Sequence, residues 1–179
     1  MLGRGVNDGD DRALARMFRE HADAVWRLAR SLGLSDAAAE DVTQETFLIV
    51  QRRWDSFATG STVRPWVLGI ARNVVRHHQR ATSRRHARMQ VVPEPPAPEA
   101  PSGEVERREA AELMQRFIAQ LDSKKREVFV LGFVEQLTPA EIAAALNIKR
   151  ATVYTRARAA EAELARFAAR VRLLDREVR

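Results

Sequence analysis

The chain has 179 residues and a formal net charge of +6, with 30 Lys and Arg against 24 Asp and Glu. It contains no cysteine, which excludes disulfides and thiolate metal sites. No apolar run approaches the roughly 20 residues of a membrane span, and the N-terminus lacks a signal-peptide core. The excess of basic over acidic residues indicates a polyanionic partner. The length suits one domain or two small ones. We expect a cytoplasmic protein.

The first helix is predicted from Arg12, because apolar residues recur at helical spacing as far as Leu32. Gly33 follows as a stop signal. Residues 1–11 are short, glycine-rich and acidic at the end, and we expect them to be disordered. His21 lies on the apolar stripe, where a half-buried core histidine is expected and not a ligand.

A second helix is predicted from Ala39 to Trp54, with Ser35 or Asp36 as its cap. Its later residues are apolar at helical spacing, so this helix should pack against the first one. Its early residues are acidic or carry amides, and the helix dipole favours carboxylates at that end. These early polar residues are Glu40, Asp41, Gln44 and Glu45.

A third helix is predicted to start near Pro65, which a first helical turn tolerates. Helical spacing gives it one apolar face and one opposite face that is cationic and can form hydrogen bonds. The apolar face consists of Val67, Ile70, Ala71, Val74 and Val75. The opposite face consists of Gly69, Arg72, Asn73, Arg76 and Arg80.

The surroundings of this cationic face suggest two interpretations. No Asp or Glu occurs between Ser56 and Pro93, and a solvated basic surface is the ordinary reading of such a run. Basic residues beside aromatic ones also suit exposed single-stranded bases, which stack and carry phosphate. The nearby aromatic residues are Trp54, Phe57 and Trp66, of which the two tryptophans are expected in the core.

The segment between the second and third helices, residues 55–63, holds small hydroxyl residues and a glycine and is predicted to be a loop. His77, His78 and His86 follow later, but their spacing fits no common zinc pattern. We therefore expect surface histidines, with no metal and no cofactor.

Together these motifs resemble region 2 of the extracytoplasmic-function (ECF, group IV) RNA polymerase sigma factors. The resemblance runs nearly continuously from Ala39 to Arg80, through Glu40-Asp-Val-Thr-Gln-Glu-Thr-Phe and Arg64-x-Trp-x-x-x-Ile-Ala-Arg-Asn. It implies that the 55–63 loop holds an unstacked promoter base. It also implies that Asp41, Gln44 and Glu45 dock on the clamp helices of the largest polymerase subunit. The residues that it assigns to −10 DNA binding are Ser56, Phe57, Thr59, Trp66, Arg72, Asn73, Arg76 and Arg80.

Most of the prolines lie in residues 91–103, which predicts a semi-rigid extended spacer. This linker separates a domain at 12–90 from a second domain at 104–175. The ECF sigma factors have a similar linker between their two conserved domains.

The second domain begins with a return to helical period over residues 104–121. Asp122 or Ser123 is predicted to cap the next helix. That helix continues through 128–134, which is apolar on nearly every side and should be buried in a small bundle.

The stretch Thr138-Pro-Ala-Glu predicts a helix start, with threonine as cap, proline first and Glu141 completing a capping box. Ala143, Asn147 and Val153 then fall at the spacing of a helix-turn-helix. The turn residue must accept a left-handed conformation, which asparagine tolerates. With Val153 facing inward, the outer face gathers a phenol, a hydroxyl and guanidiniums, as in major-groove readers. Any three-helix bundle can also show this spacing.

This half resembles sigma region 4, which reads the −35 element, through Asp122-x-x-x-Arg-Glu-Val-Phe-Val-Leu and Leu137-Thr-Pro-Ala-Glu-Ile-Ala-Ala-Ala-Leu. The sequence departs from the family where Lys149 replaces the usual serine before the recognition helix, which puts the cap of that helix in doubt. The residues that the resemblance assigns to −35 binding are Lys149, Arg150, Ala151, Tyr154, Thr155 and Arg158. From Val153 to Leu174 a heptad-like apolar seam is expected to fold back on the bundle, although it could bind another helix.

The sequence thus predicts an all-α chain of two small helical bundles joined by a Pro-rich linker. The resemblance implies an ECF-type sigma factor that binds core RNA polymerase at the clamp helices and flap region, directs it to promoter DNA and assists promoter opening. It also implies a separate anti-sigma factor as regulator. No nucleophile–base pair, phosphate loop or metal set is present, so an enzyme is not expected.

Two alternatives remain open from the sequence. One is a stand-alone helix-turn-helix regulator with residues 1–90 as a dimerisation or sensing domain. The other is an interaction protein that binds polymerase without opening promoters.

Overall fold

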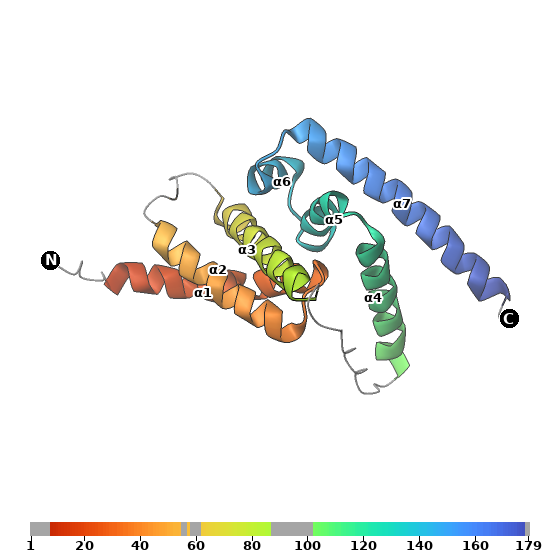
Figure 1. Cartoon of the computed structure of the whole chain (residues 1–179), viewed down its shortest axis with the longest axis horizontal. Helices are drawn as coiled ribbons and strands as arrows, with labels where there is room; N and C mark the ends of the chain where they lie inside the picture. The colour runs from red at the N-terminus through yellow and green to blue at the C-terminus, as the bar shows by residue number, and fades with distance from the viewer. Residues whose placement is uncertain (1–7, 55–56, 58–61, 87–101, 178–179) are drawn as a thin grey trace.

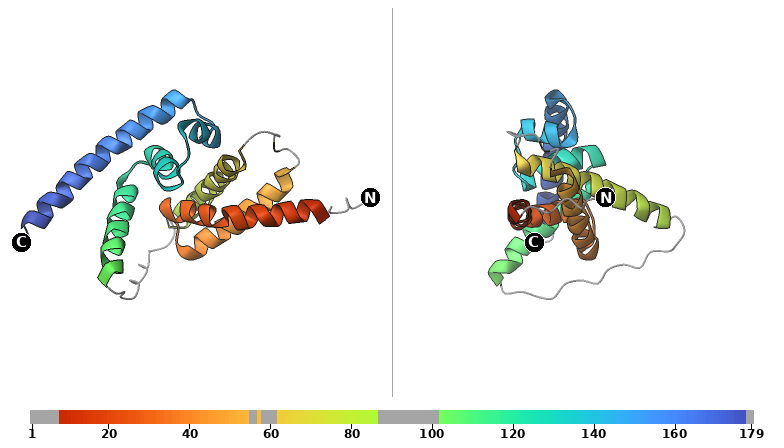
Figure 2. Two further views of the ribbon diagram at one scale, coloured as in Figure 1. Left: turned by 180° about the vertical axis from the view of Figure 1, so that it is seen from behind. Right: turned by 90° about the vertical axis from the view of Figure 1, so that its left-hand side faces the viewer.

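The computed structural model describes residues 8–54, 57, 62–86 and 102–177 (Figure 1). Every regular element in these ranges is helical, and the helices form two bundles that lie side by side in Figure 1 and in the left view of Figure 2. The first bundle consists of α1 (Asp8–Ser31), α2 (Asp36–Arg53) and α3 (Val63–His86). The second consists of α4 (Ser102–Gln120), α5 (Ser123–Phe129), the π-helix η2 (Val130–Val134), α6 (Pro139–Leu146) and α7 (Arg150–Glu177). The all-α prediction is confirmed.

Helices α1 and α4 begin earlier than the sequence predicted. Helix α1 begins at Asp8, so the expectation of disorder up to residue 11 is wrong for its last part. The helix starts with the sequence Asp-Gly-Asp-Asp, and the helix dipole favours acidic residues in a first turn. Helix α4 begins at Ser102, so the final two residues of the predicted linker, Ser102 and Gly103, are helical.

The first bundle packs α1, α2 and α3 against one another. Ser35 caps α2 as predicted, since its hydroxyl accepts a hydrogen bond from the backbone N–H of Ala38 at 3.3 Å. His21 is half-buried on α1, and burial lowers the pKa of its imidazole. The apolar face predicted for α3 is buried as a whole, and it joins Val25, Leu28, Val42 and Val50 in the core of this bundle.

The second bundle forms around α5 and η2. Asp122 caps α5 by accepting hydrogen bonds from the backbone N–H groups of Lys124 and Lys125 at 3.0 and 3.1 Å. The apolar segment 128–134 is buried at Val128, Val130 and Leu131 as predicted, but Phe133 is 52% exposed. Residues Val130–Val134 form a π-helix, and the bundle does not cover this apolar segment on every side.

The helix-turn-helix is confirmed in detail. Thr138 and Glu141 form the predicted capping box, with Pro139 at the first turn of α6. Asn147 ends α6 in the left-handed conformation, with φ 52° and ψ 52°. Val153 lies on the inner face of α7 and is buried, so the predicted residue faces inward where α6 and α7 cross.

We expect Thr138→Ala to lower the free energy of unfolding by about 1 kcal/mol, the usual value of an N-cap side chain. The Thr138 hydroxyl accepts from the Glu141 N–H at 3.3 Å and donates to the Glu141 carboxylate at 2.8 Å, and both bonds are lost. Urea denaturation followed by circular dichroism measures the change. Ser123→Ala is the control, because Ser123 is exposed beside the Asp122 cap without being the cap; an equal loss in both variants would contradict the prediction.

The capping box also has a pH dependence. The hydrogen bond from the Thr138 backbone N–H holds the pKa of the Glu141 carboxyl below its ordinary value. Because the folded pKa is lowered, this contribution to stability is present above the pKa of the unfolded chain. It is lost as the pH falls through the folded value.

The apolar seam on α7 folds back on the bundle as far as Phe167. Val153 and Ala160 are buried, and the ring of Phe167 lies 5.6 Å from that of Phe117 on α4. The expected intramolecular packing is confirmed for this part. Beyond it α7 extends past the rest of the molecule (Figure 1), and Leu173 is exposed. The side chain of Leu174 lies outside the described residues. No helix in the described part of the chain has the length and apolarity needed to cross a membrane.

Candidate polymerase and nucleic-acid interfaces

The predicted polymerase-binding residues share one face of α2. Asp41 and Gln44 are exposed and Glu45 is partly exposed, and their spacing of three and four residues places them side by side. Glu45 also faces α3, with its carboxylate 2.9 Å from Nε2 of His78. Leu48 continues the same face and is 53% exposed. The sequence analysis did not place Leu48 on this polar face. The signal for it was an apolar residue that lies outside the apolar stripe by which α2 packs in the core.

Three aromatic side chains cluster where α2 ends and α3 begins. The ring of Phe57 lies 4.8 Å from Trp66 and stacks on Trp54 at 5.8 Å, and the two tryptophans are 6.4 Å apart. All three are partly buried, so the preference for the tryptophans in the core is confirmed in part. Ser56 and Thr59, both predicted to contact −10 DNA, lie outside the described residues.

The predicted cationic face of α3 is divided. Asn73, Arg76 and Arg80 are exposed. Arg72, in contrast, is 14% exposed, and its Nη2 donates to the carboxylate of Glu127 on α5 at 2.6 Å. The prediction of a continuous open basic face is therefore wrong at Arg72, because the second bundle covers that side chain.

A second acidic residue of the helix-turn-helix bundle also meets α3. The side chain of Glu135 is fully buried, and Arg64 of α3 donates to its carboxylate at 2.8 Å. Arg27 of α1 donates to the same carboxylate at 3.2 and 3.3 Å. The sequence analysis did not predict that Glu127 and Glu135 pair with arginines of the first bundle. The signal for them was an acidic residue at each end of an apolar run.

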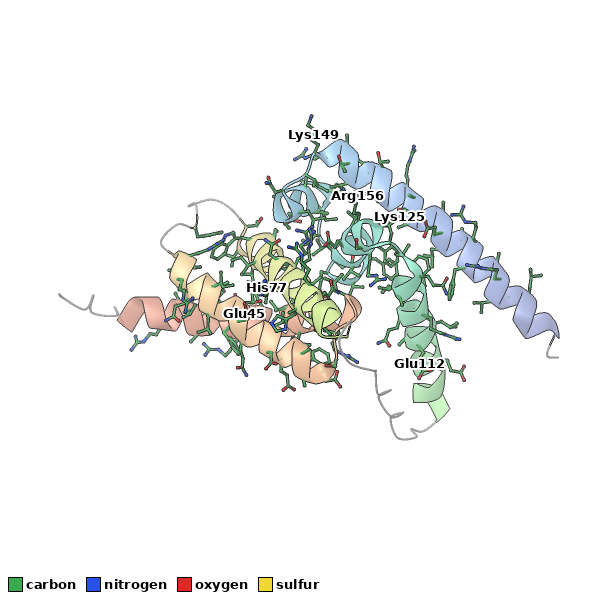
Figure 3. The ribbon with its side chains drawn as sticks, viewed as in Figure 1. Glu45, His77, Glu112, Lys125, Lys149 and Arg156 are labelled. Atoms are coloured by element: carbon green, nitrogen blue, oxygen red, sulfur yellow. The ribbon has the colours of Figure 1, made fainter. Side chains whose placement is uncertain are left out.

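The six predicted −35 residues gather at the start of α7, and all are exposed. Figure 3 shows Lys149 at the end of α7 that adjoins α6. Lys149 offers no side-chain cap, since ammonium groups only donate; its carbonyl instead accepts from the N–H groups of Thr152 and Val153. The Thr155 hydroxyl donates to the Ala151 carbonyl at 3.0 Å and keeps its lone pairs for a donor. Tyr154 and Arg158 project from the same outer face.

An ion-pair network fixes α7 against α5. The ammonium of Lys125 lies 2.7 Å from Glu163 and 2.8 Å from Asp122. Its hydrogen bond to Asp122 raises the pKa of Lys125 and lowers the pKa of Asp122. The two helices are thus connected on the surface as well as through the core, which orients the outer face of α7.

Within the described residues no group of three or more His, Cys, Asp and Glu could hold a metal ion. His77 is exposed, and His78 contacts Glu45. His86 lies at the end of α3, and its side chain is outside the described residues.

Comparison with known families agrees with this division into two units. The sigma-70 region 2 family matches residues 17–85, which covers most of α1 to α3. The sigma-70 region 4 family matches residues 111–164, which covers α5, α6 and parts of α4 and α7.

Individual proteins match over nearly the whole chain. The ECF RNA polymerase sigma factor SigC of Mycobacterium tuberculosis is 34% identical over 169 residues, covering 92% of this chain and 88% of SigC. The structure of CnrH with the cytosolic domain of CnrY superposes with a TM-score of 0.68 at 25% identity, covering 89% of both chains. The sigma factor RpoE in complex with the anti-sigma factor NepR from Bartonella quintana shares the fold, with a TM-score of 0.68 at 21% identity over 89% of this chain and 96% of RpoE. The chain therefore belongs to the extracytoplasmic-function RNA polymerase sigma factor family, whose members are transcription initiation factors.

Proposed function

We propose that this ECF sigma factor works through three separate faces: α2 for core polymerase, α3 for the −10 region and the start of α7 for the −35 duplex. The observation that carries the proposal is the helix-turn-helix, in which a buried Val153 leaves all six predicted −35 residues exposed on one outer face. A helix with donors and acceptors on such a face fits the major groove.

Core polymerase binding is assigned to the α2 face of Asp41, Gln44, Glu45 and Leu48. A partly exposed apolar side chain among carboxylates and an amide supports this role. Interfaces of this kind combine a desolvated apolar contact with charged groups that set orientation. The clamp helices of the largest polymerase subunit are the proposed partner, and the flap region is the proposed partner of the second bundle.

The −10 region is assigned to α3, the aromatic cluster beside it and the residues of the 55–63 loop. Exposed Asn73, Arg76 and Arg80 supply hydrogen bonds and positive charge. Phe57 and Trp66 are partly exposed beside the start of α3. Cationic and aromatic side chains together suit a separated strand, whose bases stack and whose phosphates carry charge.

We expect Arg158→Ala to weaken binding to the preferred −35 duplex by about 1–3 kcal/mol if its guanidinium reads a base. The loss should be smaller on duplexes altered at the contacted position, so specificity relaxes there. Fluorescence anisotropy over a duplex series measures both effects. Arg166→Ala serves as the control, since it removes the same exposed side chain further along α7. An equal, small loss on every duplex would make Arg158 a phosphate contact instead.

Run-off transcription tests the proposed function. Bacterial core RNA polymerase is incubated over a pool of promoter fragments with and without the full chain. Protein-dependent, sequence-specific transcripts are expected. The DNA upstream of their start sites then identifies the −35 and −10 sequences together. Duplex binding without polymerase and without transcripts would be the behaviour of a stand-alone helix-turn-helix regulator and would overturn the proposal.

The chain is proposed to act in the cytoplasm as a binding protein without catalytic activity of its own, since polymerase supplies the chemistry of transcription. A separate anti-sigma factor is proposed as its regulator. CnrH was solved with the cytosolic domain of CnrY, which supports a protein partner of this kind for a chain of the same fold.

A further inference from the structure

We propose that Thr155 selects, within the −35 element, a base that presents an amino group in the major groove, adenine or cytosine, and disfavours guanine and thymine. Thr155 belongs to the −35 face, the exposed outer face at the start of α7. The inference rests on the proposed function of this face and adds the class of base that one of its side chains recognises. The −35 face consists of Lys149, Arg150, Ala151, Tyr154, Thr155 and Arg158.

The proton of the Thr155 hydroxyl is already used inside the helix. A threonine hydroxyl has one O–H donor and two lone pairs. In α7 this hydroxyl lies 3.0 Å from the backbone oxygen of Ala151, one turn earlier. A carbonyl oxygen can only accept a hydrogen bond, so the hydroxyl donates its single proton to it. Because Thr155 is exposed, its oxygen lone pairs remain accessible to a partner that donates.

The surrounding helix holds Thr155 in this arrangement. Val153 and Ala160 lie on the inner side of α7, before and after it, and they are 1% and 0% exposed. The first turn is regular, since the carbonyl of Lys149 accepts from the N–H groups of Thr152 and Val153 at 2.9 and 3.2 Å. The inner side of α7 is therefore anchored in the core, and Thr155 meets the groove from a fixed position on the outer side.

The other side chains of the −35 face have different hydrogen-bonding capacities. The ammonium of Lys149 and both guanidiniums of the face can only donate, which suits guanine N7 and O6 and the phosphates. Ala151 has no polar side-chain atom. The phenol of Tyr154 is 57% exposed and can either donate or accept. While its bond to the Ala151 carbonyl is kept, Thr155 is thus the side chain of this face whose polar group can only accept.

An acceptor of this kind divides the four bases into two pairs. In the major groove adenine N6 and cytosine N4 carry amino hydrogens, whereas guanine O6 and thymine O4 are acceptors. The Thr155 oxygen can bond to the amino groups, and it is repelled by the two carbonyl oxygens. Exchange of adenine for cytosine keeps an amino group on the same strand, and exchange for guanine or thymine replaces it by an acceptor. The expected signature is one position of the −35 element that accepts adenine or cytosine alone.

Thr155→Val tests this signature, because it removes the hydroxyl, keeps a branched side chain of similar shape and hardly changes helix propensity. Preferred duplexes are selected from a randomised pool with the full chain, and each of the four base pairs is then placed in turn at every selected position. Fluorescence anisotropy measures the affinities. In the unaltered chain we expect one position at which adenine and cytosine bind about three- to tenfold more tightly than guanine and thymine. In Thr155→Val this preference should disappear, while preferences at the other positions stay within about twofold.

Three controls assign the effect to the hydroxyl and to the amino group. Thr155→Ser should retain the preference, since a serine hydroxyl can form the same bond to the carbonyl four residues earlier. Thr152→Val makes the same change three residues earlier, at a partly buried residue outside the −35 face, and it should leave the base preference unchanged. A duplex whose preferred base lacks only its exocyclic amino group should bind the unaltered chain more weakly. That duplex should bind Thr155→Val as tightly as the normal duplex does.

The possible results separate this inference from the proposed function. A preference for guanine or thymine at the position that Thr155→Val alters would overturn the inference. An equal loss on every duplex would also overturn it, because Thr155 would then contact a phosphate, and so would unchanged binding by Thr155→Val or the absence of any selected sequence. Failure of the proposed function has a different signature, namely no protein-dependent transcript in the run-off experiment, whichever bases the duplex selection returns.

Discussion

Replacing Asp41 and Glu45 together by lysine is expected to weaken binding to core RNA polymerase by about 100-fold or more. Loss of one partner of a desolvated charge pair costs about 2–5 kcal/mol, and reversal adds repulsion. Both carboxylates lie on the exposed face of α2 that also presents Gln44 and Leu48. Titration of labelled core polymerase with the full chain measures the affinity, and the −35 duplex affinity should remain because α7 belongs to the other bundle.

Two controls make this result specific. Glu20→Lys with Asp23→Lys changes the net charge equally at exposed residues of α1, and it should leave polymerase affinity nearly unchanged. Glu45→Gln alone retains a polar group opposite His78 and should give a smaller loss than the double reversal. If the double variant bound polymerase as tightly as the unaltered chain, the assignment of the α2 face would be wrong.

Phe117→Ala is expected to lower the free energy of unfolding of the second bundle by about 3–5 kcal/mol, as for other buried aromatic residues. Phe117 is 2% exposed, and its ring lies 5.2 Å from Phe129 on α5 and 5.6 Å from Phe167 on α7. The substitution therefore leaves a cavity where three helices meet. Since small domains have only about 5–15 kcal/mol of stability, α7 should lose its support near physiological temperature and −35 binding should fail.

The three tryptophans of the chain, Trp26, Trp54 and Trp66, all lie in the first bundle. Tryptophan fluorescence thus reports unfolding of that bundle, while circular dichroism reports both. In Phe117→Ala the dichroism transition should begin at lower urea than the fluorescence transition. Phe133→Ala is the matched control, because the ring of Phe133 also contacts that of Phe129 but is 52% exposed. This substitution should cost no more than about 1.5 kcal/mol. Equal losses in both variants would show that the aromatic contact at Phe117 does not anchor α7.

Local features of this protein are determined by the sequence itself. The start of α6 depends on Thr138, Pro139 and Glu141, and its end on Asn147, all within one short segment. The apolar faces of α2 and α3 follow from helical spacing in the same way. Such signals are readable because the residues that form a cap, a turn or a buried stripe are close together in the chain. The family resemblance of both halves rests on the same local patterns.

Only the tertiary structure determined which residues of the cationic face on α3 are buried and paired and which are exposed. Arg72 meets a carboxylate 55 residues away and Arg64 one 71 residues away, and no local pattern encodes such a pair. From the sequence, Glu127 and Glu135 are acids at the ends of an apolar run, and Gly69 is a residue that could lie on an open surface. Packing of the two bundles buries all three. The physical reason is that hydrogen-bonded arginine partners and close backbone contact exist only when residues far apart in the chain are brought together, so burial and pairing are properties of the fold.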